Sequence, residues 1–365
     1  MKAKRVLDKK NILVIAGLSN EKLISKVAPL LRLDDIDRVY VIRKQPIKYE
    51  SIISYFPVKI LRRNIILAEV WRLFAISYIL LTKKVDIIMG IYFFPHGLIA
   101  GLFGFLNGKR IIQNLIGDDL PKVVGSEFCL KLLRKSKVVI NRGENTRDIL
   151  IKAGIPGRSI FQPPNVIEIE KLPLKTRNDS AAYDLIFVGG LVHVKRVDVL
   201  LNSVANVKYK FGLSNLRLAI VGDGVLRKKL CNTANDLRIR DNVIFLGYQS
   251  NIFPNLTESK VFIMTSDYEG LPMAMIEAMA VGLPCIVPNV GNITTVAKNN
   301  YNSFVVQPGD INGFSKAIHC LLTDDDCYNR IAKNVLITRE RKFSKYSMEN
   351  VVDIWRTILQ TAISL

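Results

Sequence analysis

The chain has 365 residues, of which 49% are hydrophobic and 23% are charged, so it is long enough for two domains of ordinary size and too apolar for intrinsic disorder. Lys and Arg total 52 against 32 Asp and Glu, and residues 1–180 hold 32 of these basic residues and 16 of the acidic ones, a net charge of +16. Five scattered Cys without a C-x-x-C pair and three His exclude a zinc module and a disulfide scaffold, and they favour reduced thiols in the cytoplasm.

The first apolar run, residues 12–18, is too short for a signal peptide and predicts a first strand. The longest apolar stretch, 64–81, is interrupted by Glu69 and Arg72, so we expect no segment that spans a membrane. The basic first half predicts an anionic partner, which is a membrane surface, a phosphorylated substrate or nucleic acid.

Short apolar runs alternate with longer helical patterns along the whole chain, as in stacked βαβ units with parallel sheets. In the first half the predicted strands are 12–16, 38–42, 87–90, 110–114 and 137–140. In the second half they are 183–189, 216–221, 243–246, 261–264, 284–287 and 303–306. The fold class is therefore α/β, with two Rossmann-like domains.

A proline-containing, charged stretch at 162–180 is the predicted linker. The domains are then 1–170 and 171–344, followed by a C-terminal helix at 345–365 that is a candidate to pack back on the first domain. Its apolar positions are Val351, Ile354, Trp355, Ile358 and Leu359.

The segment "MTSDYEGLPMAMIEAMAVGLPCIVPNVGN", residues 264–292, holds most of the candidate chemistry. A strand ends near Thr265, a polar loop reaches Gly270, and a helix is predicted over 271–280 with Pro272 in its first turn. The free N–H groups and the positive end of such a helix form a seat for a diphosphate.

Two acids, Glu269 and Glu277, stand eight positions apart in this segment. Glu277 lies in an otherwise apolar helix, and a buried ionised carboxylate needs a partner. Sugar hydroxyls would satisfy it, and so would solvent or a lysine.

Two further loops follow predicted strands. In "FVGGLVHVKRVDVLL", Gly190 allows close approach of a ligand, and Lys195 and Arg196 can neutralise a diphosphate or form an ordinary solvated pair at a helix start. In "AIVGDG", Gly222 belongs to a G-x-G that lacks the third glycine of a dinucleotide fingerprint, so a plain tight turn is the alternative to a nucleotide contact.

In this order the segments resemble the second half of the GT-B glycosyltransferases, specifically the large retaining family numbered four, also described as glycosyl transferases group 1. The likeness covers residues 183–310 and rests on "LGY" at 246–248, the pair Glu269 and Glu277, "GLPCIV" at 282–287 and "NSFVVQPGD" at 302–310. In the first half it is thinner, through "IPGRSIFQPPNVIEI" and "SKVVINRGENTRDIL". The resemblance implies two Rossmann-like domains that face each other across a cleft.

The resemblance also implies roles. Lys195 would contact the donor diphosphate, Glu277 the ribose hydroxyls and Glu269 the hydroxyls of the transferred sugar, so Lys195 and Glu269 are the predicted catalytic residues. Backbone N–H groups for the phosphates would come from Gly270, Leu271, Pro272 and Met273 as a segment, and base contacts from the surroundings of Gly222 and Tyr248.

Enzymes of this kind need no bound metal and no cofactor, because a basic side chain and a helix dipole stabilise the leaving group. We therefore interpret Asp324, Asp325 and Asp326 as a solvated turn between helices and not as a metal site.

Three positions depart from the family pattern. Gly190 stands where many members have Arg, which makes Arg196 the candidate second cation. Thr295 stands where many have an acid in "GGxPE", and Ile116 replaces the histidine of an N-terminal "HG" pair.

On the acceptor side the predicted residues are Gly17 and Ser19 after the first strand, His96 in "IYFFPHG", and Asp119 in "QNLIGDD". A structural role with one hydrogen bond is the alternative for His96.

Stretches 64–84 and 98–110 combine large apolar residues with basic ones, which fits a helix face lying on anionic lipid. Ordinary core helices with basic ends are the alternative.

We therefore predict a retaining glycosyltransferase that moves a sugar from a UDP-sugar or GDP-mannose to a lipid-linked or saccharide acceptor in the interdomain cleft. It would act in the cytoplasm, peripherally at the inner face of the cell membrane, in the synthesis of cell-surface polysaccharide or glycolipid. Two alternatives remain: a nucleic-acid-binding protein, against which the dispersed Lys and Arg count, and a GT-B sugar-nucleotide epimerase, which would turn over without an acceptor.

Overall fold

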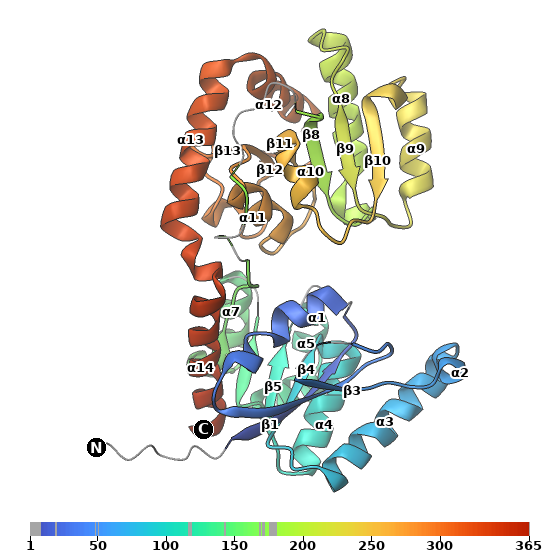
Figure 1. Cartoon of the computed structure of the whole chain (residues 1–365), viewed down its shortest axis with the longest axis vertical. Coiled ribbons are helices and arrows are strands. Elements are labelled where there is room, and N and C mark those ends of the chain that lie inside the picture. The colour runs from blue at the N-terminus through green and yellow to red at the C-terminus, as the bar shows by residue number, and fades with distance from the viewer. Residues whose placement is uncertain are drawn as a thin grey trace. The chain divides into compact units, whose positions relative to one another are not determined.

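The computed structural model describes residues 9–18, 20–47, 49, 51–115, 119–141, 144–167, 169, 172–174 and 181–364. The chain divides into two compact units (Figure 1). Unit 1 comprises Met1–Val166 and Met348–Leu365, and unit 2 comprises Ile167–Ser347. Each is built around its own parallel sheet.

Unit 1 contains a seven-stranded sheet in the order β3-β2-β1-β4-β5-β6-β7, in which every pairing is parallel. Its central strands β1 and β4 are buried almost throughout, because helices cover both faces of the sheet. The strands are β1 (Lys10–Ala16), β2 (Ile36–Ile42), β3 (Ile52–Tyr55), β4 (Ile87–Ile91), β5 (Arg110–Asn114), β6 (Val138–Ile140) and β7 (Ile160–Phe161).

The helices of unit 1 form separate packing clusters on the two faces of this sheet. One cluster joins α1 and α14 to residues such as Ile12 and Val14, and another joins α3 and α4 to Leu13 and Ile15. Alternate residues of β1 therefore serve opposite layers. The helices are α1 (Asn20–Val27), α2 (Lys59–Arg62), α3 (Ile65–Thr82), α4 (Leu98–Leu106), α5 (Asp119–Val124), α6 (Glu127–Arg134), α7 (Glu144–Lys152) and α14 (Met348–Ser364).

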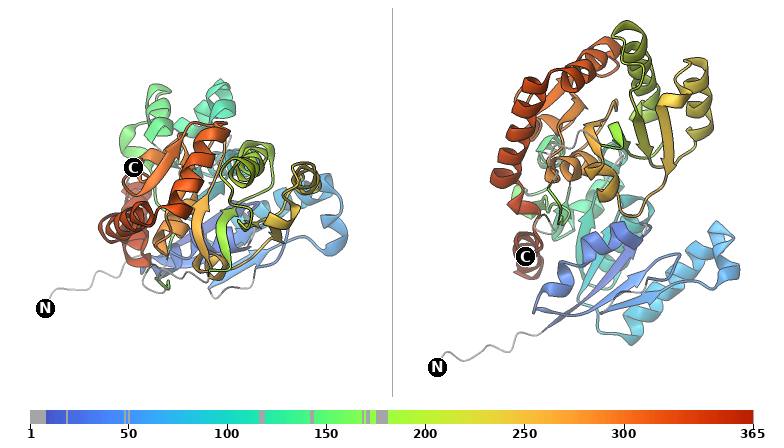
Figure 2. Two further views of the ribbon diagram at one scale, coloured as in Figure 1. Left: turned by 90° about the horizontal axis from the view of Figure 1, so that it is seen from above. Right: turned by 45° about the horizontal axis from the view of Figure 1, so that its top comes forward.

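Unit 2 contains a six-stranded parallel sheet in the order β10-β9-β8-β11-β12-β13, with helices on both faces (Figure 2). One continuous apolar cluster fills it. The strands are β8 (Tyr183–Val188), β9 (Leu218–Val221), β10 (Val243–Gly247), β11 (Ser259–Ile263), β12 (Cys285–Pro288) and β13 (Ser303–Val306). The helices are α8 (Val197–Lys210), α9 (Arg227–Asp236), α10 (Phe253–Thr257), α11 (Met273–Ala280), α12 (Ile311–Thr323) and α13 (Asp325–Lys342).

All the strands predicted from the sequence are present, with bounds that shift by a few residues. The sequence missed β3 and β7, which are the two edge strands of unit 1. Both are short and partly exposed, so neither carries a continuous apolar run that marks a buried strand.

The two units meet in sequence near the start of the predicted linker. Ile167 and Ile169 are buried in the apolar cluster of unit 2, so the boundary falls at Val166 rather than at residue 170. The rest of the predicted linker lies largely outside the described residues.

The C-terminal helix packs on the sheet of unit 1, as expected. Residues 344–346 form a separate 3-10 turn, and α14 begins at Met348. Val351, Trp355 and Ile358 are buried in the cluster that also contains α1 and β1. The helix is therefore part of the core of unit 1 although it follows unit 2 in the sequence.

Helix α3 differs from the expectation that stretch 64–81 is too interrupted by charges to span a membrane. It has a mean hydropathy of 1.8 over 18 residues and is, within the described residues, the one helix long and apolar enough to cross a membrane by length and composition. However, Ala75, Ile76 and Ile79 pack against strands of unit 1, and Arg72 forms an ion pair with Glu69 on the same helix. Its place in the fold is that of a covering helix, with 28% of its apolar window buried.

In both sheets the chain reverses its direction of winding at the first strand, between β1 and β4 and between β8 and β11. Loops at the carboxyl ends of these strand pairs diverge and leave a crevice, which is where ligands bind in open α/β sheets. The sequence segments singled out above lie at these two edges.

We expect Trp355→Ala to destabilise unit 1 by about 3–5 kcal/mol, because the indole is 3% exposed and its removal leaves a cavity in the core. Thermal and urea unfolding of the full chain would measure the loss. The matched control is Gln360→Ala, at an exposed position of the same helix, which should change stability by less than about 0.5 kcal/mol. Equal effects would contradict the packing of α14.

Candidate active site

Two loops at the carboxyl edge of the unit 2 sheet are bonded to each other. The hydroxyl of Thr265, just after β11, donates to the carbonyl oxygens of Lys195 at 3.2 Å and Arg196 at 2.8 Å. The N–H of Asp267 donates to the carbonyl oxygen of Val194 at 2.9 Å. The turn before α8 and the loop after β11 are therefore held as one surface at the point where the sheet reverses its winding.

Lys195 and Glu269 meet on this surface. The ammonium Nζ of Lys195 lies 2.5 Å from Oε1 of Glu269, and the Ser266 hydroxyl donates to the same oxygen at 2.8 Å. The lysine side chain is 23% exposed and that of the glutamate 11% exposed, so the pair is partly shielded from water. The sequence predicted both residues and missed Ser266, whose only signal was its place in the polar loop.

The backbone at Gly291 fixes the loop that carries Glu269. A Cβ at Gly291 would lie 1.8 Å from the carbonyl oxygen of Glu269, and the residue has a φ of +55°. The neighbouring N–H of Asn292 donates to the carbonyl oxygen of Gly270 at 2.9 Å. Thr295 stands where the family often has an acid. Its hydroxyl donates a hydrogen bond to the carbonyl oxygen of Asn292 at 2.6 Å and so stabilises the turn in which Thr295 lies.

Helix α11 presents its start beside this loop. It begins at Met273, so Pro272 is the N-cap residue and not part of the first turn as predicted. Pro272 has no N–H and gives no side-chain cap, which leaves the first-turn N–H groups without a capping side chain. Gly270 has open space around its Cα, and half-buried Leu271 connects it to the helix. These groups form a seat for an anion.

Glu277 lies one turn into α11. Burial raises the pKa of this carboxyl from its ordinary 4.5 to about 7, and no hydrogen bond or ion pair to it is found among the described residues. Pairing with a lysine therefore finds no support among the described residues, whereas contact with solvent stays open because Glu277 is only half-buried. A carboxylate that is desolvated and unpaired is suited to accept hydrogen bonds from a ligand's hydroxyl groups.

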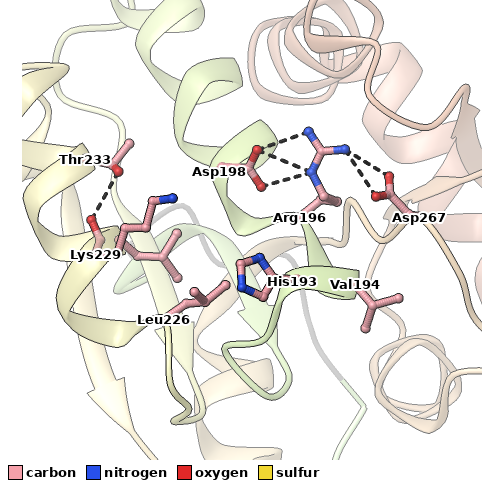
Figure 3. A pocket seen from close by; sticks show the side chains of 9 residues that line it. His193, Val194, Arg196, Asp198, Leu226, Lys229, Thr233 and Asp267 are labelled. Carbon is pink, nitrogen blue, oxygen red and sulfur yellow. Dashed lines mark hydrogen bonds and ion pairs between the residues drawn. The ribbon is translucent and has the colours of Figure 1, made fainter.

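Arg196 is placed differently from the predicted second cation. It has a left-handed φ of 46°, and its guanidinium binds Asp198 and Asp267 at 3.1 Å each (Figure 3). Hydrogen bonds to these two carboxylates raise its pKa. It lines a cavity of about 510 Å³ with His193 and Lys229, beside α9 rather than with the Lys195–Glu269 pair. Sequence reasoning missed this cavity, because α9 residues reach it only through the fold.

The remaining donor-side residues lie at neighbouring strand ends. Gly222 has a φ of +134°, and a Cβ there would lie 1.9 Å from the carbonyl oxygen of Gly189, so glycine is required for the ends of β8 and β9 to approach. Gly190 is exposed, with nothing closer than 3.9 Å to a Cβ built on it. Tyr248, which follows β10, is 64% exposed. Their contact with a nucleotide stays a prediction.

In unit 1 the predicted acceptor-side residues Gly17 and His96 touch. A Cβ at Gly17 would lie 2.5 Å from Cε1 of His96, so glycine is needed at this position to leave room for the ring. His96 is 8% exposed, and burial, followed by the nearby charges of Arg72 and Lys44, lowers the pKa of its imidazole to about 4. Its Nδ1 has no hydrogen-bond partner among the described residues, which argues against the simple structural alternative.

Asp119 holds the loop that carries His96. Its carboxylate is buried and accepts hydrogen bonds from the N–H of Phe93 at 2.7 Å and of Phe94 at 3.4 Å. The structure thus supports a positioning role, and a direct acceptor contact of Asp119 stays a prediction. Ser19 and Ile116 lie outside the described residues.

A cavity of about 440 Å³ surrounds Gly17 and His96 and is also lined by Arg43, Lys44 and Arg72. The sequence analysis did not single out these three cations. A signal was available, because Arg43 and Lys44 directly follow β2 and so lie at the same carboxyl edge as Gly17. Arg72 comes from α3 and gave no such signal.

One group of residues in unit 2 has the composition of a metal site. Cys320, Asp324 and Cys327 place one ligand atom each within 4.8 Å of one another, and the two Sγ atoms are 3.0 Å apart. Asp324 accepts a hydrogen bond from the N–H of Cys327 and so caps α13, and Arg330 Nη2 lies 3.8 Å from the Cys327 sulfur. Of the predicted turn, only Asp324 lies between α12 and α13, because Asp325 and Asp326 belong to the first turn of α13. The nearby guanidinium disfavours a cation at this group.

Comparisons with known proteins show which family the sequence of unit 2 matches. Residues 168–336 match the family described as glycosyl transferases group 1. N-acetyl-alpha-D-glucosaminyl L-malate synthase of Bacillus anthracis is 26% identical over 76% of this chain and 74% of its own length. Unit 2, which contains residues 168–336, therefore belongs with the group 1 glycosyltransferases.

Two further likenesses extend the finding. UDP-Gal:alpha-D-GlcNAc-diphosphoundecaprenol alpha-1,3-galactosyltransferase of Escherichia coli is 37% identical, over 32% of this chain and 30% of its own length. The structure of HepE from Anabaena, in complex with UDP and glucose, superposes with a TM-score of 0.75 at 17% identity and covers 97% of this chain and 99% of HepE. The glycosyltransferase therefore has the GT-B fold, and its class favours the enzyme hypothesis over the nucleic-acid-binding alternative.

We expect Glu277→Gln to stabilise the glycosyltransferase at pH 8.5 and to leave its stability nearly unchanged at pH 5. The native pKa of about 7 lies above the ordinary 4.5, so the favourable contribution of Glu277 is complete below pH 4.5 and is lost as the pH rises through 7. The amide removes the burial cost of the charge, on the order of 2 kcal/mol at high pH. Thermal unfolding at both pH values measures it, with exposed Glu340→Gln as the control. An effect of Glu277→Gln that is independent of pH would contradict the raised pKa.

Proposed function

We propose that this glycosyltransferase transfers a sugar from a nucleoside diphosphate sugar to an acceptor hydroxyl with retention of configuration, and that unit 2 binds the donor. The observation that carries the proposal is the Lys195–Glu269 pair, 2.5 Å apart, beside the uncapped start of α11. A cation and free N–H groups stand together there, as a diphosphate requires. The order of motifs resembles that of the retaining family numbered four, which supports the proposal.

The donor diphosphate binds Lys195 and the first-turn N–H groups of α11. Its negative charge competes with Glu269 for the lysine ammonium, so Lys195 moves from the carboxylate to the phosphate oxygens or is shared by both. Glu269, still held by Ser266 at 2.8 Å, is then available to accept hydrogen bonds from the hydroxyls of the transferred sugar. The ion pair thereby keeps both groups ordered before the donor arrives.

Glu277 accepts hydrogen bonds from the two ribose hydroxyls. A carboxylate with two oxygens can receive both, and the ionised form accepts more strongly than the neutral acid. Because the pKa of the free carboxyl is about 7, donor binding strengthens as the pH rises through that value.

In the transfer step, the bond between the anomeric carbon and the diphosphate oxygen breaks, and the acceptor oxygen forms a bond to that carbon on the same face of the sugar. The acceptor proton passes to an oxygen of the departing diphosphate. The products are the glycoside and the nucleoside diphosphate, and no side-chain nucleophile takes part. Lys195 and the α11 N–H groups stabilise the charge that develops on the leaving group, so we propose that turnover requires no resident metal ion.

For the nucleotide we propose UDP, with GDP as the alternative. The name of the Escherichia coli relative specifies UDP-Gal, and HepE was crystallised with UDP and glucose. The same relative acts on a diphosphoundecaprenol-linked sugar, which supports a lipid-linked acceptor for this enzyme, in the synthesis of a cell-surface glycan.

A lipid-linked acceptor places the enzyme at a membrane, and one surface of unit 1 is suited to lie there. In Figures 1 and 2, α2 and the start of α3 stand out from the sheet of unit 1. This α2–α3 surface exposes many large apolar side chains: Val58, Ile60, Ile65, Ile66, Leu67, Val70, Leu73, Phe74, Tyr78 and Leu81. It is flanked by Lys59, Arg62, Arg63, Lys83 and Lys84. Apolar insertion together with basic flanks is how peripheral helices bind anionic lipid.

We expect Lys195→Ala and Glu277→Ala each to lower kcat/KM by at least ~10²-fold while the fold is retained, since each removes a group that holds the donor or its leaving group. Donor candidates are first ranked by thermal shift with UDP and GDP, and transfer is then followed by nucleoside diphosphate release. Exposed Lys210→Ala on α8 serves as the control and should be fully active. Full activity in purified Lys195→Ala and Glu277→Ala would refute the proposed donor site.

We expect Leu81→Ser to weaken binding to phosphatidylglycerol vesicles roughly tenfold, because a leucine side chain no longer enters the bilayer interface. Co-sedimentation of the full chain measures the loss. Val225→Ser is the matched control, as Val225 in unit 2 is 82% exposed and Leu81 is 85% exposed. Equal binding by the two variants would show that the α2–α3 surface does not contact lipid.

A further inference from the structure

The cavity of unit 1 carries an excess of positive charge that the fold does not neutralise. Arg43, Lys44 and Arg72 all line its roughly 440 Å³, and among the described residues the one carboxylate on its wall is that of Glu69. Glu69 pairs with Arg72, which is 2% exposed. Two cationic side chains therefore remain without a carboxylate on the cavity wall.

Arg43 is fixed in place with bonding capacity to spare. It is 4% exposed, and it donates to Oδ1 of Asn20 at 2.6 Å and to the carbonyl oxygen of Leu18 at 2.9 Å. A guanidinium has five N–H groups in a planar fork, so two such bonds leave others for a ligand. Burial lowers the pKa of Arg43, because desolvation disfavours the charged form.

Lys44 and His96 complete the wall. Lys44 is half-buried and makes no hydrogen bond or ion pair with any described residue. His96 is 8% exposed with an unpartnered Nδ1. Two such groups on one cavity wall, without partners among the described residues, are costly unless something binds them.

The fold explains why these groups meet. Gly17 follows β1, Arg43 and Lys44 follow β2, and His96 lies in the loop after β4. These are the strands on either side of the winding reversal in unit 1, so their carboxyl-end loops line one crevice. Gly17 contributes by lacking a side chain, which leaves the crevice open beside the His96 ring.

We propose that this cavity binds the phosphate or diphosphate group that links the acceptor to its carrier. The proposal rests on the proposed function, since it assigns the acceptor to unit 1. Two unneutralised cations match the charge of a phosphate-type oxyanion, and arginine forks fit its oxygens in pairs. The cavity would thus recognise the charge and shape of the phosphate group of the acceptor. The sugar that receives the transferred residue would be bound elsewhere.

Calorimetric titration of the full chain with inorganic pyrophosphate, at saturating UDP to fill the donor site, tests the proposal. We expect saturable binding that Lys44→Gln weakens at least tenfold. Lys122→Gln, at an exposed position of unit 1 outside the cavity, is the matched control and should bind as the parent chain does. Lys44 has no partner among the described residues, so we expect its replacement to leave the fold intact. An unchanged thermal shift with UDP verifies this and reports the proposed donor site separately.

Two further ligands separate the sources of the anion. Farnesyl diphosphate in detergent should bind at least as tightly as pyrophosphate and with the same dependence on Lys44, which supports a carrier-linked group. Binding of pyrophosphate without farnesyl diphosphate would overturn the acceptor assignment, because the cavity would then take only a free anion. Equal binding of malate would overturn the preference for phosphate, and no saturable pyrophosphate binding, or no effect of Lys44→Gln, would overturn the site itself.

Discussion

The ion pair between Lys195 and Glu269 is the interaction on which the proposed donor site depends. Partly shielded ion pairs contribute little net stability, because the desolvation of both groups offsets their attraction. Here the pair is held by the hydroxyls of Ser266 and Thr265 and by the close backbone approach at Gly291. Several local contacts therefore hold in place an ion pair that itself adds little to the stability of the fold. That arrangement is understandable if both charged groups are kept in register for a ligand that later separates or shares them.

The two units bring their candidate site residues together by the same feature of their sheets. A parallel sheet directs all its carboxyl ends to one edge, and the reversal of winding opens a crevice there. In unit 2 that edge brings together Lys195 and Glu269 near the start of α11. In unit 1 it brings together Gly17, Arg43 and His96, and α3 adds Arg72 from the side. Close approach of loops requires glycine at both edges, as Gly17 and Gly291 show.

Basic residues of the first half of the chain occur in two separate places of unit 1. Arg43, Lys44 and Arg72 point their charge into a cavity, whereas Arg62, Arg63 and Lys83 flank the apolar α2–α3 surface. Helix α3 contributes to both, since Arg72 lies on its buried side and Phe74 on its exposed side. A single helix can line a cavity and also present an exposed apolar surface, because residues two positions apart face different sides.

The sequence by itself determined the α/β class, the central strands, the limits of the two units to within a few residues, and the loop that carries Glu269 and Glu277. These follow from local patterns, because buried strands are continuous apolar runs and helix starts carry their own signals. It missed the edge strands β3 and β7, which are short and half-exposed, and it could not foresee that Arg196 binds Asp198 and Asp267. Only the tertiary structure decided that Arg72 joins Arg43 and His96, since residues on α3, after β2 and after β4 meet through packing that no local pattern encodes.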